Sequence, residues 1–111
     1  ALREFLYVDD MAEASIFVIE LDEEAYYKNI NKSLSHINIG IGKDITIREL
    51  AETIRNVVGF KGDLKFDKSK PDGTKRKLVD TSKLKKIGWT AKTDLKEGLN
   101  KTYKWYVENY V

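Results

Sequence analysis

The sequence contains no cysteine, which excludes disulfide bonds, thiolate metal ligands and a thiol nucleophile. A chain without cysteine fits a reducing compartment, so we expect a cytoplasmic protein. Histidine is almost absent as well, because His36 stands alone. No carboxylate or nucleophile accompanies it in a recognisable pattern, so we expect it to make a structural hydrogen bond in a strand.

Net charge and long apolar runs are also lacking. The 20 basic and 18 acidic residues leave a net charge of +2, too little for a general nucleic-acid binder. Any basic site must therefore be local. No apolar run approaches the roughly 20 residues of a membrane span, and the first residues do not have the pattern of a signal peptide. We expect neither nucleic acid nor a membrane as a partner.

What is present indicates one folded domain. The chain has 111 residues, of which 41% are hydrophobic and 34% charged, a balance typical of a globular protein. The sequence opens inside a strand-like segment and without an initiator methionine. We therefore expect a piece of a longer protein, called the parent protein below.

The N-terminal part predicts a strand followed by a helix. Residues 5–8 have the pattern of a short strand, and Asp9 or Asp10 is expected to cap a helix that ends near Leu21. Residues 22–35 are polar, with paired tyrosines, and predict a loop with a helical continuation.

That first helix is apolar over much of its circumference. Ile16, Phe17 and Ile19 lie beside its main stripe and widen it. A helix of this kind is usually buried on two sides. We expect an exposed apolar patch here, with residues 5–8 as an unprotected strand edge through which the chain self-associates.

The clearest local signal lies in the middle of the chain. Thr46 and Glu49 have the spacing of a capping box, and the apolar periodicity that follows ends at Gly59, which suits a left-handed helix terminus. Residues 36–39 and 64–66 predict strands on either side. The fold class expected is α/β, a small sheet with a βαβ unit and flanking helices.

The C-terminal part predicts two further helices. Residues 68–77 form a loop. Asp80 is then expected to cap a short helix that ends at Ile87 and is closed by Gly88, with Trp89 packing back onto it.

Asp94 and Glu97 repeat the capping-box spacing and predict a last helix to about Asn109. Its expected stripe consists of Leu95, Leu99, Thr102, Tyr103 and Tyr106, with Trp105 beside it. Aromatic residues at helical spacing are more often packing residues than a stacking platform.

Two features needed for redox catalysis are missing. Gly40 and Gly42 follow a predicted strand, but Ile45 occupies the place of the third glycine of a dinucleotide-binding fingerprint. We therefore predict a tight turn there. No tyrosine is followed by a lysine four residues later. The adjacent Asp9 and Asp10 lack a third carboxylate, so we expect no metal site.

Two basic segments look like halves of one anion site. Arg3 stands just before a strand-to-helix junction, while Arg76 and Lys77 follow the turn around Pro71, the only proline. Together with Lys75 these two residues form a run of three cations, and such a run by itself more often belongs to a solvated surface. The rigid turn and the planar guanidinium groups favour a diphosphate instead.

Four segments in a fixed order resemble the extended short-chain dehydrogenases/reductases. They are residues 3–12 (REFLYVDDMA), 38–51 with NIG and TIRELA, 83–89 (KLKKIGW) and 95–99 (LKEGL). Residues 34–38 (LSHIN) and 69–78 (SKPDGTKRKL) are similar to the members of that family that act on GDP-sugars.

The resemblance implies the C-terminal lobe of such an enzyme, covering residues 1–111. Arg3 and Lys77 match the residues that hold the diphosphate of the GDP-sugar, with Arg76 adjacent. The implied parent protein is an NADPH-dependent 3,5-epimerase/4-reductase of GDP-4-keto-6-deoxy-D-mannose in nucleotide-sugar biosynthesis, and a homodimer. Catalytic residues and the NADP-binding Rossmann lobe would lie outside this chain, which alone would be inactive and bind no cofactor.

Two alternatives remain open. The parent protein could be a related GDP-sugar 4-reductase that has no epimerase activity. The chain could instead be a free-standing nucleotide-sugar-binding or assembly module. The length of the natural protein separates the second from the enzyme, because two lobes need about two to three times this length.

Overall fold

The computed structural model describes residues 1–28, 30 and 35–111. The elements in chain order are β1 (Leu2–Glu4), α1 (Val8–Ile19), α2 (Glu23–Lys28), β2 (Asp44–Thr46), α3 (Ile47–Val58), β3 (Arg76–Lys77), α4 (Ser82–Ile87) and α5 (Leu95–Tyr110). The helix expected within residues 22–35 is therefore present as α2, although part of that segment lies outside the described residues.

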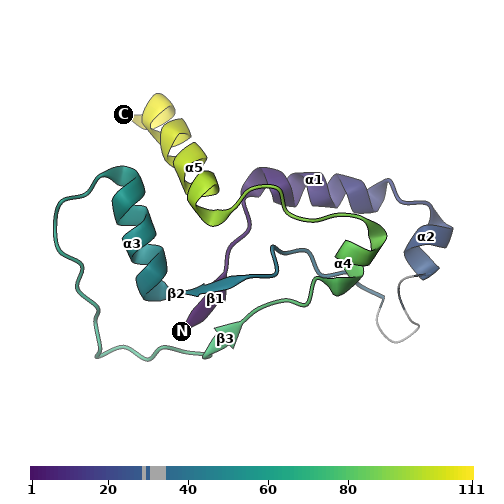
Figure 1. Ribbon diagram of the computed structural model, residues 1–111, viewed down its shortest axis with the longest axis horizontal. Coiled ribbons are helices and arrows are strands. Elements are labelled where there is room, and N and C mark those ends of the chain that lie inside the picture. Colours follow the sequence, from purple (N-terminus) through teal and green to yellow (C-terminus); the bar gives the residue numbers. More distant parts are fainter. Residues whose placement is uncertain (29, 31–34) are drawn as a thin grey trace.

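The chain forms an open, thin layer. Its radius of gyration is 17.3 Å and its shortest dimension 19 Å, whereas a compact domain of about 100 residues has a radius of roughly 13 Å. In Figure 1 the small sheet lies between α3 on one side and α1 with α4 on the other, and the segment from α3 to β3 forms a wide loop at the edge. One layer cannot enclose a large core.

The sheet has three short strands in the order β2-β1-β3, with β1 antiparallel to β2 and parallel to β3. The α/β class is thus confirmed. The βαβ unit predicted around α3 is wrong, because residues 36–39 and 64–66 form no strand in the described part of the chain. An alternating pattern yields a strand only where a neighbouring strand supplies hydrogen-bonding partners.

The first strand lies earlier than predicted. Residues 5–8 do not pair: β1 ends at Glu4, and α1 already begins at Val8. The pairing partners explain this shift. The Leu2 N–H donates to the Lys75 carbonyl over 2.8 Å, and the Ala1 carbonyl accepts from the Ile47 N–H over 3.2 Å.

The predicted cap of α1 is also wrong. The N-cap is Tyr7, which makes no side-chain capping bond, and both aspartates lie in the first turn. Asp10 is instead 4% exposed and binds a distant segment. Its carboxylate accepts the backbone N–H groups of Lys92 and Thr93 over 3.1 and 2.9 Å, which attaches the segment before α5 to α1.

The signals around α3 are confirmed. Thr46 accepts the Glu49 N–H over 3.1 Å, and Glu49 accepts the Thr46 N–H over 2.9 Å. Gly59 ends the helix with φ of 72°, a conformation that favours glycine. The turn expected at Gly42 has φ of 78°, but it leads into β2 before the helix begins.

The closing helices follow the prediction closely. The Asp80 carboxylate accepts the Ser82 N–H at the start of α4, although the N-cap residue is Thr81. Asp94 caps α5 by accepting the Glu97 N–H over 2.8 Å. The Glu97 carboxylate forms an ion pair with Lys101, one turn further along the helix.

The core is small and lies where α1 meets α4. Among the described residues, only Ala14, Leu84 and Trp89 are buried hydrophobics, and Phe17 packs against them. The Trp89 indole donates to Glu13, so this residue packs back as predicted. Within the described part of the chain, no helix is long and apolar enough to cross a bilayer.

Candidate anion site on the sheet

Two of the three predicted cations lie on the same face of the sheet, on adjacent strands. Arg3 and Lys77 are paired residues of the parallel strands β1 and β3, 74 positions apart in sequence. Paired residues of adjacent strands direct their side chains to the same face. The two cations therefore flank a common surface, as closely spaced phosphates would require.

The Arg3 guanidinium is held by the turn that precedes β3. Its Nη1 donates to the carbonyls of Leu2 and Thr74, over 2.8 and 2.7 Å. Gly73 in this turn has φ of 74°, a left-handed conformation that favours glycine. Within the described part of the chain, Nη1 is the only nitrogen of the Arg3 guanidinium that donates a hydrogen bond. The Nε and Nη2 groups are therefore left as donors for an anion.

Arg76 is directed elsewhere. As the neighbour of Lys77 in a strand it lies on the opposite face of the sheet. Its Nε donates to Asp44 Oδ2 over 2.6 Å, in an ion pair whose carboxylate is largely covered. The structure therefore brings Arg3 and Lys77 together and pairs Arg76 with an acid on the other side.

A further cation, Lys43, lies beside Arg3, although no sequence motif singles it out. Lys43 and Arg3 both line a cavity of about 120 Å³, whose wall also includes Ile45 and the Asp94 carboxylate. The only signal for Lys43 is its position directly before β2, which pairs with β1. Its proximity to Arg3 depends on that antiparallel pairing.

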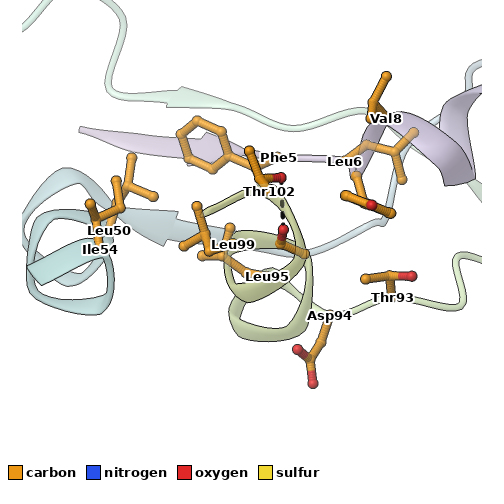
Figure 2. Close-up of a pocket in the computed structure, with 12 residues that line it drawn as sticks. Phe5, Leu6, Val8, Leu50, Ile54, Thr93, Asp94, Leu95, Leu99 and Thr102 are labelled. Atoms are coloured by element: carbon orange, nitrogen blue, oxygen red, sulfur yellow. Dashed lines mark hydrogen bonds between the residues drawn. The ribbon is translucent and has the colours of Figure 1, made fainter. Parts of the chain in front are cut away.

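An apolar hollow lies next to this site. Its volume is about 390 Å³, and it opens between α3, α5 and the segment that joins β1 to α1. Figure 2 shows Leu50 and Ile54 on one side, Leu95 and Leu99 on another, and Phe5 above them. The lining also includes Asp94 and Thr102, but Asp94 already accepts the Glu97 N–H and Thr102 donates to the Gly98 carbonyl. Most of the remaining lining is apolar, so the hollow offers mainly apolar contact surface.

A second apolar surface runs along α1. Val8, Met11, Ile16 and Ile19 are 68, 43, 56 and 81% exposed. Phe17, which was expected on this surface, instead packs against the core. The helix thus has one face covered by the chain itself and one uncovered, as its wide apolar circumference predicted.

The single histidine lies away from both surfaces. His36 is exposed, outside any strand, and lines a polar hollow of about 180 Å³ with Asn38, Asp80, Ser82 and Lys83. The backbone N–H of Ser82 lowers the pKa of Asp80 below its ordinary value. A carboxylate that accepts an N–H at the start of a helix is typical of a helix N-terminus, so the lowered pKa of Asp80 does not indicate a catalytic site.

One further carboxylate has a shifted pKa. The hydrogen bond from Lys92, followed by that from Trp89, lowers the pKa of Glu13 below its ordinary value of 4.5. Glu13 lies on the packed side of α1 and binds the Trp89 indole. The lowered pKa therefore comes first from the partly exposed ion pair with Lys92 and not from the anion site.

Comparison with known proteins identifies the relatives. No family model matches the sequence. The chain is 56% identical over 108 residues to the GDP-L-fucose synthase of Escherichia coli K12, covering 97% of this chain and 34% of that protein. It therefore spans about a third of the length of the curated relatives that it matches.

Two solved structures share the fold over nearly the whole chain. A GDP-6-OMe-4-keto-L-xylo-heptose reductase from Campylobacter jejuni superposes with a TM-score of 0.88 at 39% identity, covering 97% of this chain and 31% of that one. A GDP-D-glycero-L-gluco-heptose synthase of the same organism, solved in the presence of NADPH, gives 0.85 at 37%, covering 96% and 30%. The resemblance to GDP-sugar enzymes is confirmed.

Proposed function

We propose that this chain is the GDP-sugar-binding lobe, residues 1–111, of an NADPH-dependent 3,5-epimerase/4-reductase of GDP-4-keto-6-deoxy-D-mannose, a GDP-L-fucose synthase in cytoplasmic nucleotide-sugar biosynthesis. The observation that supports it most is the pairing of Arg3 with Lys77 on one face of the sheet. The 56% identity to a protein of that name favours this substrate over other GDP-sugars.

The proposed role of the two cations is to bind the diphosphate. Two linked phosphates carry closely spaced negative charges, and cations from separate strands can neutralise both. The guanidinium offers two donors in a plane, while the lysine adds a mobile point charge. This contact orients the substrate at a distance from the reacting carbon, so it contributes binding rather than proton or hydride transfer.

The chain's own residues do not fit NADPH. In a dinucleotide fold the N–H groups of a glycine turn approach the pyrophosphate. Here the Gly42 N–H already donates to the Glu4 carboxylate over 2.5 Å. A Cβ at Gly40 would lie 2.7 Å from that carboxylate, which leaves no room for an anion. We therefore assign the cofactor and the catalytic residues to the rest of the parent protein.

One specific observation favours a second candidate. The reductase from Campylobacter jejuni has the same fold over 97% of this chain, and its name states reduction of a 4-keto sugar and does not mention epimerisation. The parent protein would then be a GDP-sugar 4-reductase, with the same role for Arg3 and Lys77. Assaying the parent protein for hydrogen exchange at C3 and C5 of the keto-sugar separates the two activities.

The cation pair gives a direct kinetic test. In the full-length parent protein, Arg3→Ala or Lys77→Ala should raise the Michaelis constant for the GDP-sugar about tenfold or more, because each charge-assisted contact contributes roughly 1.5–3 kcal/mol. Turnover should fall less, since the diphosphate is remote from the reacting carbon. Arg76→Ala is the matched control, because its guanidinium is paired with Asp44 on the other face.

Steady-state kinetics with the GDP-sugar as the varied substrate measure both parameters. Unchanged Michaelis constants in the Arg3 and Lys77 variants would refute the diphosphate assignment. If Arg76→Ala raised the Michaelis constant as much as the other two variants, the face of the sheet on which a cation lies would not decide whether it contacts the diphosphate.

The proposed macromolecular partner is the NADP-binding lobe of the same polypeptide, and the assembled parent protein is proposed to be a homodimer. The open layer and the small core support a covering lobe, and they disfavour a free-standing module. Two of the uncovered apolar surfaces are the hollow between α3 and α5 and the exposed stripe of α1.

The isolated chain should therefore self-associate as its concentration rises, because uncovered apolar surface is removed from water by contact between copies. Light scattering over a concentration series measures this. Ile19→Asn should weaken the association, since that side chain is 81% exposed on the stripe. Lys104→Asn, on the exposed side of α5, is the control. A strict monomer at high concentration would contradict the prediction.

A further inference from the structure

The carboxylate of Glu4 joins three separate segments of the chain. Its Oε1 accepts the N–H of Val79 over 3.1 Å, and its Oε2 accepts the N–H of Gly42 over 2.5 Å. These donors lie 75 and 38 residues away in the sequence. One side chain therefore holds the end of β1, the turn before β2 and the segment after β3.

The strand that carries Lys77 needs such support. β3 has only two residues, Arg76 and Lys77. Before it, the Lys75 carbonyl accepts the Leu2 N–H over 2.8 Å. After it, the bond from Val79 to Glu4 is a side-chain contact that continues the attachment where the strand has ended. Lys77 lies between these two points.

The packing around the carboxylate is close. A Cβ at Gly40 would lie 2.7 Å from Glu4 Oε2 and 2.6 Å from Val79 Cγ2. The glycine therefore permits the carboxylate and the segment after β3 to meet. Glu4 and Arg3 are adjacent in a strand and lie on opposite faces of the sheet, so Glu4 can act on the position of the cations without occupying the anion surface.

We propose that Glu4 is a positioning residue that sets Lys77 opposite Arg3 for diphosphate binding. This inference rests on the proposed function of the cation pair. A carboxylate is required because it presents two acceptor oxygens to two N–H donors, whereas an amide presents one oxygen and places an NH₂ against the second donor. When the two hydrogen bonds to Glu4 are lost, the segment after β3 is no longer attached to β1. Lys77 then spends less time opposite Arg3.

The test uses the full-length parent protein with Glu4→Gln and Glu4→Ala. Both variants should raise the Michaelis constant for the GDP-sugar about tenfold, the range expected when hydrogen bonds to a charged group are lost, with turnover within about threefold of the wild type. Glu52→Gln, an exposed residue of α3, is the matched control. Glu4→Gln decides the test if Glu4→Ala does not fold.

A double-mutant cycle separates positioning from general damage. If Glu4 acts through Lys77, then adding Glu4→Gln to Lys77→Ala should increase the Michaelis constant by less than about twofold, because coupled residues are not additive. Amide hydrogen exchange of peptides containing Val79 and Gly42 should speed up in Glu4→Gln and stay unchanged in Glu52→Gln. This readout does not depend on activity.

The outcomes distinguish the two proposals. If Arg3→Ala and Lys77→Ala both leave the Michaelis constant unchanged, the diphosphate assignment fails, whatever Glu4 does. If only Lys77→Ala leaves it unchanged, the positioning role of Glu4 fails and Arg3 remains the diphosphate ligand. If Lys77→Ala raises the Michaelis constant while Glu4→Gln leaves both binding and amide exchange unchanged, only the positioning role is refuted. Full additivity in the double mutant, with Lys77→Ala active as predicted, would also overturn the positioning role.

Discussion

The isolated chain of 111 residues is expected to show no NADPH oxidation with GDP-4-keto-6-deoxy-D-mannose. Binding energy at a diphosphate cannot replace a hydride donor and a proton donor. The sequence contains no tyrosine with lysine four residues later, and the glycine turn at residues 40–42 is filled by the Glu4 carboxylate. The expected effect is a complete loss of reductase activity relative to the parent protein.

The assay follows absorbance of NADPH, with the full-length parent protein as the positive control. The Arg3→Ala variant of the isolated chain is a useful second sample, because a contaminating reductase would be equally active in both preparations. Turnover by the pure chain that disappears in this variant would overturn our assignment of the catalytic residues to the rest of the polypeptide.

Replacement of Asp10 by Ala is expected to lower the free energy of unfolding of the chain by about 2–4 kcal/mol. The carboxylate is 4% exposed and accepts the N–H groups of Lys92 and Thr93. Without it, two donors lose their partner, and the attachment of the segment before α5 to α1 is lost. An acid in the first turn also interacts favourably with the helix dipole, which adds to the effect.

The neighbouring Asp9 provides a matched control. It lies in the same first turn but is exposed, so Asp9→Ala should change stability by no more than about 0.5–1 kcal/mol through the helix dipole. Urea titrations followed by circular dichroism compare the two variants. Because the core is small, the loss at Asp10 is a large share of the total stability. Equal midpoints for both variants would contradict the role of the buried carboxylate.

The helices could be predicted because their signals are local. The capping box of Thr46 and Glu49 and the terminus at Gly59 involve hydrogen bonds within a few residues, and the structure has both. The start of α5 at Asp94 follows the same rule. The family resemblance, based on motifs in a fixed order, led to relatives that the comparisons confirm.

The strands and the role of Asp10 could not be predicted in this way. Residues 36–39 and 64–66 alternate like strands, but a strand needs partners from elsewhere in the chain, and the described residues provide none. The pattern of Asp10 before a helix suggested a cap. Only the folded chain shows that its acceptors serve backbone groups 82 and 83 residues away.

The anion site combines both kinds of information. Sequence alone determined which charges are available, that no cysteine chemistry exists, and which helices form, because composition and contacts between near neighbours need no fold. The tertiary structure decided that Arg3 is paired with Lys77 across two strands, while Arg76 forms an ion pair with Asp44. The reason is the register of β1 against β3: a shift by one residue would exchange the two faces and place the other cation beside Arg3.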